Sequence, residues 1–515
     1  MGMWVGIALM AGASVPAPTV RVPRKPSEIP RYSALRHGMV TGEPIADRWP
    51  RRLSGPAPGS PPCDDASVLR VALPTRPPSP GLGCGPMAGE SAPWIRLVNN
   101  EPLNPAEEQI AWTSVTNQVI QFYQARVTRD PKDPAQYRNL GAAYIQKARE
   151  TGDVMYLGLA EQTLKRALEL QPTPPLATTV TTRLAAVALS RHQFQEAIGY
   201  AEQALAYGTG QLFPYAVLGD TYFEMGEYEK AAETYAKAAS APGAAAVLST
   251  RLAALRFLRG QVQDAIDETE RGVEALLNDK APRENVAWAE FRLGELYFHA
   301  GDLAKAETAY GNAVRRYAGY HWALGGLAKV RAAQTRYPEA VRLYEQAMAV
   351  IPLPQYAADL GDVYTKLGRT REAAKPYALV EYIGALNAIN REIYNRDLAL
   401  FYADHDLKRR HALELAEREL TARRDVYTYD VLAWSYYKNG NPEAALPAMT
   451  EALKLGTKDA RLFFHAGMIH HALGHPEQAR DYLQRALATN PSFHVLQAEV
   501  ARRTLKALEG GQSSP

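Results

Sequence analysis

One stretch in the middle of the chain, residues 215–238, carries small and large apolar residues at helical spacing on both sides of a glycine turn. Gly219 lies within a predicted first helix, and Gly226 marks the turn that ends it. Ala231 and Tyr235 then share one face of a predicted second helix. Because glycine and alanine have almost no side chain, the two backbones can approach closely there. A hairpin this small cannot bury its apolar face alone, so the pattern predicts further copies stacked beside it.

The small residues recur at a nearly constant interval. Successive second-helix alanines are separated by 34, 34, 41, 34 and 33 residues, and the last two are again 34 apart. These alanines are Ala197, Ala231, Ala265, Ala306, Ala340, Ala373, Ala445 and Ala479. The matching first-helix residues are Ala185, Gly219, Ala253, Gly294, Ala328, Gly361, Ala433 and Gly467. A period this regular indicates a tandem array of helical hairpins.

The motif L-G-x-x-Y, followed by A-x-x-x-Y, resembles the tetratricopeptide repeat, and it is clearest around Gly219 and Ala231. The resemblance implies an all-α fold, a right-handed α-solenoid of about nine or ten stacked antiparallel helix pairs, known as a TPR superhelix. It leaves the function open, because unrelated functions are built on the same fold.

The sequence divides into five expected segments. Residues 1–103 are rich in Pro, Gly and Ser and predict a disordered segment. Residues 104–129 predict an N-terminal capping helix, 130–491 the repeat solenoid, and 492–508 a C-terminal capping helix. Residues 509–515 are expected to form a disordered tail.

Three irregularities interrupt the period. In the first hairpin, Gly141 and Ala160 are 19 residues apart instead of 12, which predicts that both helices extend by a turn. The interval from Ala265 to Ala306 carries an extra helical turn around 277–284, which we expect to form a longer loop. Residues 381–425 match the repeat poorly and predict a degenerate repeat rather than a separate domain.

Charge and composition exclude several classes of protein. Residues 1–100 carry 11 basic and 6 acidic side chains, which gives 11 − 6 = +5, so the remainder of the +3 chain carries −2. The predicted helical part therefore lacks the basic character of a nucleic-acid-binding domain. No apolar run is long enough to span a membrane, and two cysteines cannot form a disulfide framework. A cytoplasmic location is the default expectation, although the apolar stretch from Met3 to Val15 leaves export possible.

No catalytic or phosphate-binding motif is present, so the sequence predicts neither an enzyme nor a cofactor. His465, His470, His471 and His475 could suggest a metal site, but Gly474 ends the helix between the last two, which favours structural histidines and no metal. Asp404-His405-Asp406 has no nucleophile motif near it and is expected to be a solvated turn.

The remaining functional candidate is the concave groove that, by the resemblance, first helices would line. Acidic residues follow the small packing residue at Asp220, Glu295 and Asp362, while Lys329 and Trp434 break that run. Aromatic residues lie one turn further on, at Phe223, Phe298 and Tyr437. Others lie at the starts of first helices, at Phe213, Trp288, Trp322 and Tyr427. An acidic groove with aromatic platforms predicts a protein or peptide partner with basic and apolar side chains.

Two alternatives stay open from the sequence. The aromatic residues can instead pack between hairpins, and the acids can be solvated, which would leave the groove inert. The chain would then be an architectural subunit of a cell-envelope or multiprotein assembly that uses its convex face or its caps. An enzyme whose active site lacks a recognisable motif is the third reading. The oligomeric state is not specified by the sequence.

Overall fold

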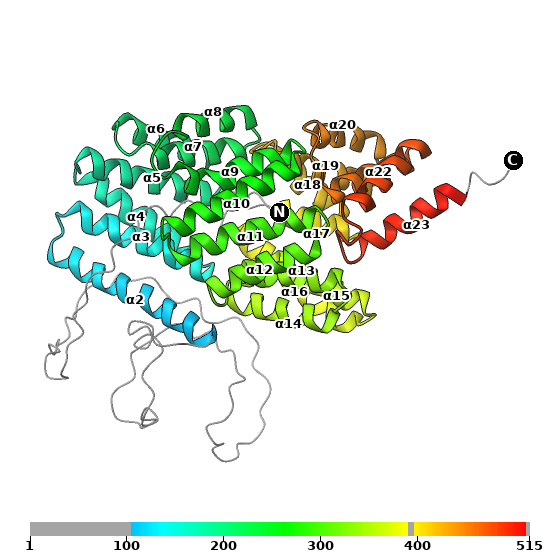
Figure 1. Cartoon of the computed structure of the whole chain (residues 1–515), viewed down its shortest axis with the longest axis horizontal. Coiled ribbons are helices and arrows are strands. Elements are labelled where there is room, and N and C mark those ends of the chain that lie inside the picture. Colours follow the sequence, from blue (N-terminus) through cyan, green and yellow to red (C-terminus); the bar gives the residue numbers. More distant parts are fainter. Residues whose placement is uncertain (1–104, 390–395, 511–515) are drawn as a thin grey trace, which may run out of the picture. The chain divides into compact units, whose positions relative to one another are not determined.

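The computed structural model describes residues 105–389 and 396–510, which form 22 helices and no strand (Figure 1). Twenty of these helices pair into ten antiparallel hairpins. The first helices are α3 (Pro134–Thr151), α5 (Pro174–Ser190), α7 (Leu212–Glu224), α9 (Ala244–Leu258), α11 (Arg283–His299), α13 (His321–Ala333), α15 (Pro354–Lys366), α17 (Arg396–Asp404), α19 (Val426–Lys438) and α21 (Ala460–Ala472). The second helices are α4 (Met155–Glu169), α6 (Phe194–Ala206), α8 (Tyr228–Ala238), α10 (Val262–Asn278), α12 (Leu303–Arg316), α14 (Tyr337–Val350), α16 (Thr370–Ile389), α18 (Arg409–Leu420), α20 (Pro442–Leu453) and α22 (Pro476–Thr489). The expected all-α solenoid of helix pairs is confirmed.

Two further helices flank the array. Helix α2 (Pro105–Arg129) packs against α3, and α23 (Gln497–Gly510) packs against α22. Their predicted role as caps, and the domain boundaries drawn from the sequence, stay predictions. The expected N-terminal segment 1–103 lies outside the described residues, as does 511–515. None of the described helices is both long and apolar enough to cross a bilayer.

The small residues lie where the sequence predicts close helix contacts. The eight second-helix alanines that mark the period are all buried. A Cβ atom added at Gly219 would come within 2.3 Å of the Tyr235 ring, and one at Gly361 within 2.2 Å of Tyr377. These positions admit no side chain because the tyrosine of the paired helix occupies the space that a side chain would need.

Neighbouring hairpins stack so that the first helices form the inner layer. Each first helix from α3 to α21 lies close to the first helix of the next hairpin, whereas successive second helices are farther apart. In a curved stack, the layer on the concave side is the more crowded one, so the first helices line the inner face. The described helices of the irregular stretch follow the same rule, since α17 and α18 form a hairpin and α17 lies close to α15 and α19.

Hairpin turns also contact loops about six repeats further along the chain. Arg424 donates its backbone N–H to the carbonyl of Met225 at 3.0 Å, and Thr457 Oγ1 donates to the carbonyl of Leu258 at 2.6 Å. Asn490 Nδ2 donates to the carbonyl of Phe298 at 2.7 Å. Such pairs are separated by 192 to 199 residues, close to six periods of about 34. We call this set of contacts the inter-turn seam, because it joins one superhelical turn of hairpins to the next.

The extra residues in the two long intervals of the sequence lengthen helices. Helices α3 and α4 contain 18 and 15 residues, against 13 and 11 in α7 and α8, as the sequence predicts. The prediction of a longer loop around 277–284 is wrong, because α10 and α11 contain 17 residues each and only residues 279–282 lie between them. The 41 − 34 = 7 additional residues therefore continue the helices, and they carry the start of α11 toward α3.

Candidate binding cavity on the inner face

Three predicted acids of the inner face share one arrangement within their own hairpins. Each accepts a hydrogen bond from the hydroxyl of a tyrosine 15 residues later, on the paired second helix. The pairs are Tyr235 with Asp220, Tyr310 with Glu295 and Tyr377 with Asp362. Because the same tyrosine also packs on the small residue that precedes the acid, one side chain serves both contacts.

Each of these acids also binds a cation from a later hairpin. Arg251 contacts Asp220 through Nε and Nη2 at 2.8 and 2.9 Å. Lys329 Nζ lies 2.9 Å from Glu295, and His405 Nε2 lies 2.6 Å from Asp362. We call these three acid–tyrosine–cation sets the acid ladder; each set ties two neighbouring hairpins together.

The His405 contact corrects the expectation of a solvated turn at Asp404-His405-Asp406. The His405 side chain is only 13 % exposed. Asp404 Oδ1 accepts hydrogen bonds from Trp434 Nε1 at 2.8 Å and from Gln497 Nε2 at 2.7 Å. Only Asp406 is exposed, where it pairs with Lys438.

Burial makes these acids internal charges. Asp220, Glu295 and Asp362 are 0, 6 and 2 % exposed. Burial raises the pKa of Asp220 to about 6, although Arg251 opposes this shift. Burial also opposes ionisation of Glu295, but Lys329 and nearby donors outweigh it and lower the pKa to about 2. A basic partner could contact these carboxylates only by displacing the cations that already bind them, and the predicted binding role of the three acids stays untested.

The predicted aromatic platforms divide into two groups. Phe213, Trp322 and Tyr437 are half-buried. The other five, Phe223, Trp288, Phe298, Tyr427 and Trp434, are at least nine-tenths buried. Trp434 stacks on the His465 ring with a centroid distance of 4.1 Å, so it packs between hairpins. Most of these rings therefore pack in the interior. Mainly the three half-buried rings are accessible to a partner from solvent.

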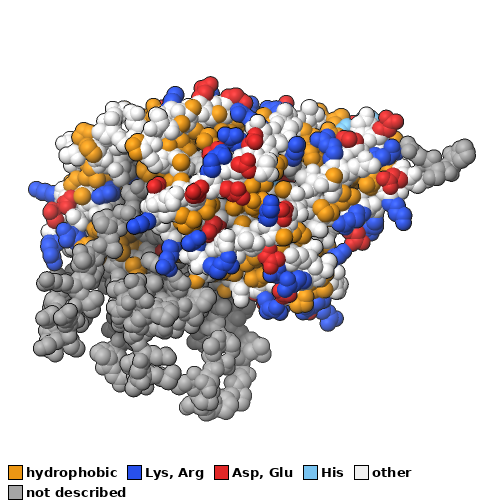
Figure 2. Space-filling model, viewed as in Figure 1, with side chains coloured by type: hydrophobic (Ala, Val, Ile, Leu, Met, Phe, Trp, Pro, Cys, Tyr) orange, Lys and Arg blue, Asp and Glu red, His pale blue; other side chains and the backbone are white. Residues whose placement is uncertain are grey.

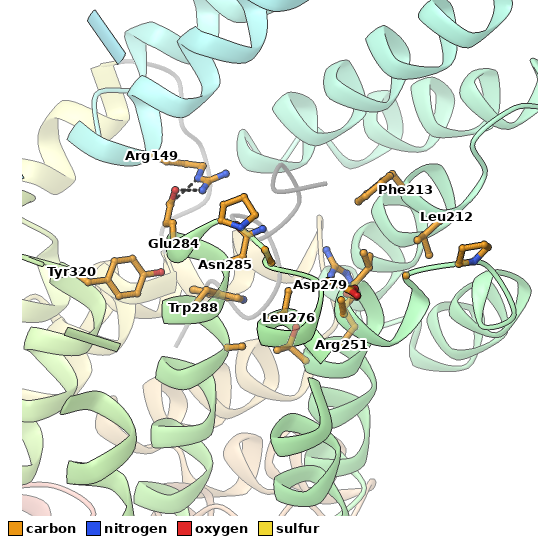
Figure 3. A pocket seen from close by; sticks show the side chains of 18 residues that line it. Arg149, Leu212, Phe213, Arg251, Leu276, Asp279, Glu284, Asn285, Trp288 and Tyr320 are labelled. Atoms are coloured by element: carbon orange, nitrogen blue, oxygen red, sulfur yellow. Dashed lines mark hydrogen bonds and ion pairs between the residues drawn. The ribbon is translucent and has the colours of Figure 1, made fainter. Parts of the chain in front are cut away.

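One cavity brings two of the predicted residues together (Figure 3). It has a volume of about 360 Å³ and opens between the starts of α7, α9 and α11. Phe213 and Trp288 line it, with Tyr320 on the loop before α13. Its other apolar lining residues are Leu212, Pro242, Ala246, Val247, Leu276, Ala281, Pro282 and Ala289. Phe223 and Tyr427 line a separate, much smaller cavity, and the other predicted site residues border neither.

A side-chain clasp bounds this cavity. Arg149, near the end of α3, donates from Nε to Glu284 Oε1 at 3.1 Å and also pairs with Oε2 (Figure 3). Gln146 Nε2 donates to Glu284 Oε2 at 3.1 Å. The clasp connects the lengthened helices α3 and α11, whose extra turns carry Arg149 and Glu284 toward each other. The two irregularities of the period therefore meet in one structural feature.

Sequence reasoning missed a set of cations on the inner face. Arg183, Arg251 and Arg292 lie on α5, α9 and α11 and are 5 to 6 % exposed. Each stands two residues before the small packing residue of its helix, and this shared position was the available signal. Burial, with the nearby charges of Arg138 and Arg149, lowers the pKa of Arg183 to about 10. These guanidinium groups are therefore buried on the first helices beside the internal acids, and Arg251 is already paired with Asp220.

No metal site is evident in the part of the chain that the structure describes, since no group of three or more His, Cys, Asp or Glu side chains is arranged to hold an ion. Acidic and basic side chains are interspersed over the face shown in Figure 2, with apolar side chains between them. That face therefore lacks the one-sided basic surface typical of nucleic-acid binding.

The stacked hairpins, their small-residue contacts and the lined inner face define a helical-repeat solenoid of the protein-binding class. Sequence models of the tetratricopeptide repeat match residues 214–242, 285–352 and 431–504. The chain is a tetratricopeptide repeat protein.

Known proteins resemble the chain over different lengths. It is 26 % identical over 225 residues to the human protein O-mannosyl-transferase TMTC1, a match that covers 42 % of this chain and 24 % of that protein. Among solved structures, yeast Tom70 aligns with a TM-score of 0.34 and 12 % identity over 79 % of this chain and 97 % of that one. The APC/C hetero-tetramer Cut9-Hcn1 aligns with a TM-score of 0.29 and 15 % identity over 81 % of this chain and 98 % of that one.

Proposed function

We propose that the chain is a protein-interaction scaffold that holds a segment of a partner protein on the inner face formed by the first helices. The observation that carries this proposal is the cavity at Phe213 and Trp288, a partly enclosed space lined by a half-buried ring of α7 and a more deeply buried ring of α11. Concave, mostly apolar sites with a few polar groups are the usual form of binding sites. An extended segment or a helix can lie along such a groove.

The structure offers more support for apolar side chains in the partner than for basic ones. The acids expected to attract a basic segment are each engaged in the acid ladder. The half-buried rings Phe213 and Trp322 offer apolar surface without disturbing any ion pair. Aromatic contacts of this kind contribute much of the binding energy in protein interfaces.

Site-specific photo-crosslinking tests where a partner binds. The photoreactive residue p-benzoylphenylalanine is placed at Phe213 in one variant and at Lys237, on the exposed face of α8, in the matched control. Each variant is added to extract from cells that produce the protein and irradiated. We expect adducts with a discrete partner from position 213 and few from 237. Adducts mainly from 237 would favour the architectural alternative, in which partners bind the convex face.

The similarity to an O-mannosyl-transferase is a reason to measure transferase activity directly. The match covers 24 % of that protein, so the activity in its name belongs to a whole protein of which this chain matches about a quarter. We propose that the chain is not an enzyme, because its sequence contains no recognisable catalytic motif. The purified chain is incubated with labelled, activated mannose donors and a peptide that carries Ser and Thr hydroxyl groups. Label transfer that depends on the chain alone would overturn this proposal.

A further inference from the structure

We infer that the cavity at Phe213 and Trp288 is an anchor site for one apolar side chain of a peptide segment that also carries a neighbouring carboxylate. This inference rests on the proposed function and specifies the guest. It differs from the sequence-based expectation of a basic partner, because the groups that border the cavity complement an acid better than a base.

The apolar part of the inference follows from the lining. Rings of Phe213, Trp288 and Tyr320 border the cavity, and aliphatic residues including Val247 and Leu276 complete it. A volume of about 360 Å³ is at the lower end for ligand pockets, which suits a single large side chain and the backbone beside it. Burying a leucine- or phenylalanine-sized side chain contributes roughly 1.5 to 3 kcal/mol.

The polar part follows from the balance of donors and acceptors around the clasp. Glu284 accepts from Arg149 at both oxygens and from Gln146 at one, so its acceptor positions are largely engaged. Arg149 uses only Nε and Nη2 in that pair, although a guanidinium carries five N–H donors. Its Nη1 group can therefore serve a carboxylate of the guest without breaking the clasp.

The surrounding charge points the same way. Arg251 also lines the cavity, held in place by Asp220 and by the carbonyl of Val247. Asp279 is the opposing charge, but it lies at the exposed rim, where water screens it. A carboxylate next to the apolar anchor therefore meets more donors than acceptors.

The position of the site within the array has a structural cause. The extra helical turns in α3 of the first hairpin and in α11 of the fifth bring Arg149 and Glu284 together, and this contact borders the cavity. Hairpins of regular length lack those turns, so the repeat pattern by itself would not create the same cavity elsewhere.

A random peptide library tests the inference on the full chain. Twelve-residue peptides are fused at their carboxyl ends to a phage coat protein, so that they present no free terminal carboxylate. Selection uses the wild-type chain, and the enriched peptides are then measured against Ala246→Phe, which fills the cavity. The matched control is Ala245→Phe, one residue earlier on α9, exposed and outside the cavity lining. We expect enriched peptides to combine a large apolar residue with a nearby Asp or Glu, and Ala246→Phe to weaken them at least tenfold while Ala245→Phe does not.

A double-mutant cycle tests the carboxylate contact separately. Arg149→Gln is combined with replacement of the peptide acid by its amide, and binding is measured by fluorescence anisotropy. We expect each single change to weaken binding about tenfold, as loss of a charge-assisted hydrogen bond does, and the double change to add little. Enriched peptides that are basic, or that bind Ala246→Phe normally, would overturn the anchor site while leaving the scaffold proposal intact. Failure to enrich any peptide, together with no crosslinks from position 213, would overturn both.

Discussion

His405, in the turn directly after α17, donates from Nε2 to Oδ1 of Asp362 on α15 at 2.6 Å, and His494 lies 3.2 Å from the other oxygen of the same carboxylate. One acid on α15 thus binds both the turn after α17 and the segment before α23. Burial alone would lower the pKa of His405, but the hydrogen bond to Asp362 and its charge outweigh burial and raise the pKa to about 9.

This arrangement predicts a loss of stability at alkaline pH. The pKa of His405 is higher in the folded chain than its ordinary value of 6.5, so its contribution is complete below pH 6.5 and is lost as the pH rises through about 9. This rise in the pKa of His405 corresponds to a contribution to folding stability on the order of 3 kcal/mol, because one pKa unit equals about 1.36 kcal/mol. Hydrogen exchange of α17 amides at pH 6 and pH 10, corrected for the intrinsic rate, should show local stability falling by this order in the wild type. The fall should be much smaller in His405→Gln.

Exposed His471 provides the matched control for this measurement. His471→Gln should keep the wild-type pH dependence, since no neighbour in the described part of the chain ties its ring to α15. If His405→Gln and His471→Gln lost stability in parallel with pH, the ion pair with Asp362 would not be the cause.

The contacts between small residues could be predicted from the sequence because they obey a local rule. Gly219, Gly294 and Gly361 each face a tyrosine of the paired helix, and no side chain fits there. Helix spacing and residue size are sufficient to find such positions. Phe213 and Trp288, which the sequence predicts for the groove, line one cavity, and their role in binding stays a prediction.

The acid ladder, the clasp and the inter-turn seam could not be predicted in the same way. The cations that bind Asp220, Glu295 and Asp362 follow them by 31, 34 and 43 residues, so they do not share one repeat position. The clasp joins residues 135 apart, and the seam joins residues up to 199 apart. These contacts depend on the curvature of the stack, which the period of the sequence does not specify.

The close contact between a first-helix glycine and the tyrosine of the paired helix predicts opposite effects for two glycine substitutions. A Cβ at Gly219 would meet the Tyr235 ring at 2.3 Å, whereas a Cβ at Gly199, inside α6, meets nothing within 4 Å. Gly219→Ala should therefore destabilise the chain by about 1 to 3 kcal/mol through overpacking. Gly199→Ala should stabilise it by about 0.5 to 1 kcal/mol through helix propensity. Denaturation midpoints in urea that shifted in the same direction for both would contradict the rule.

The inter-turn seam predicts a second pair of unequal glycine variants. Gly226 and Gly440 both occupy hairpin turns with positive φ, at 83° and 77°. A Cβ at Gly226 would lie 2.5 Å from the carbonyl oxygen of Arg424, whereas a Cβ at Gly440 meets nothing. Both alanine variants should incur the left-handed backbone cost of about 1 to 2 kcal/mol. Only Gly226→Ala should also push the two turns of hairpins apart.

Crosslinking across the seam measures that difference. Cysteines introduced at exposed positions on either side, such as Glu227 and Arg424, should react with a short bifunctional reagent in the wild type and in Gly440→Ala. The yield should fall several-fold in Gly226→Ala. Equal yields in all three chains would mean that the seam does not hold the turns together in solution.

Substitution of Asp220 tests whether the acids of the acid ladder stabilise the fold or bind a partner. Its carboxylate is fully buried and carries both bonds of Arg251, so Asp220→Asn should leave a buried guanidinium without its counter-charge. Breaking a buried pair in this way costs about 3 to 5 kcal/mol, whereas Glu233→Gln on the exposed face of α8 should stay within about 0.5 kcal/mol. Replacing both partners, as in Asp220→Asn with Arg251→Met, should recover part of the loss because no charge is then left alone. Thermal unfolding is measured for the wild type and four variants. These are Asp220→Asn, Glu233→Gln, Arg251→Met alone, and Asp220→Asn combined with Arg251→Met. An Asp220→Asn chain that kept wild-type stability but lost its partner would show instead that this acid acts in binding.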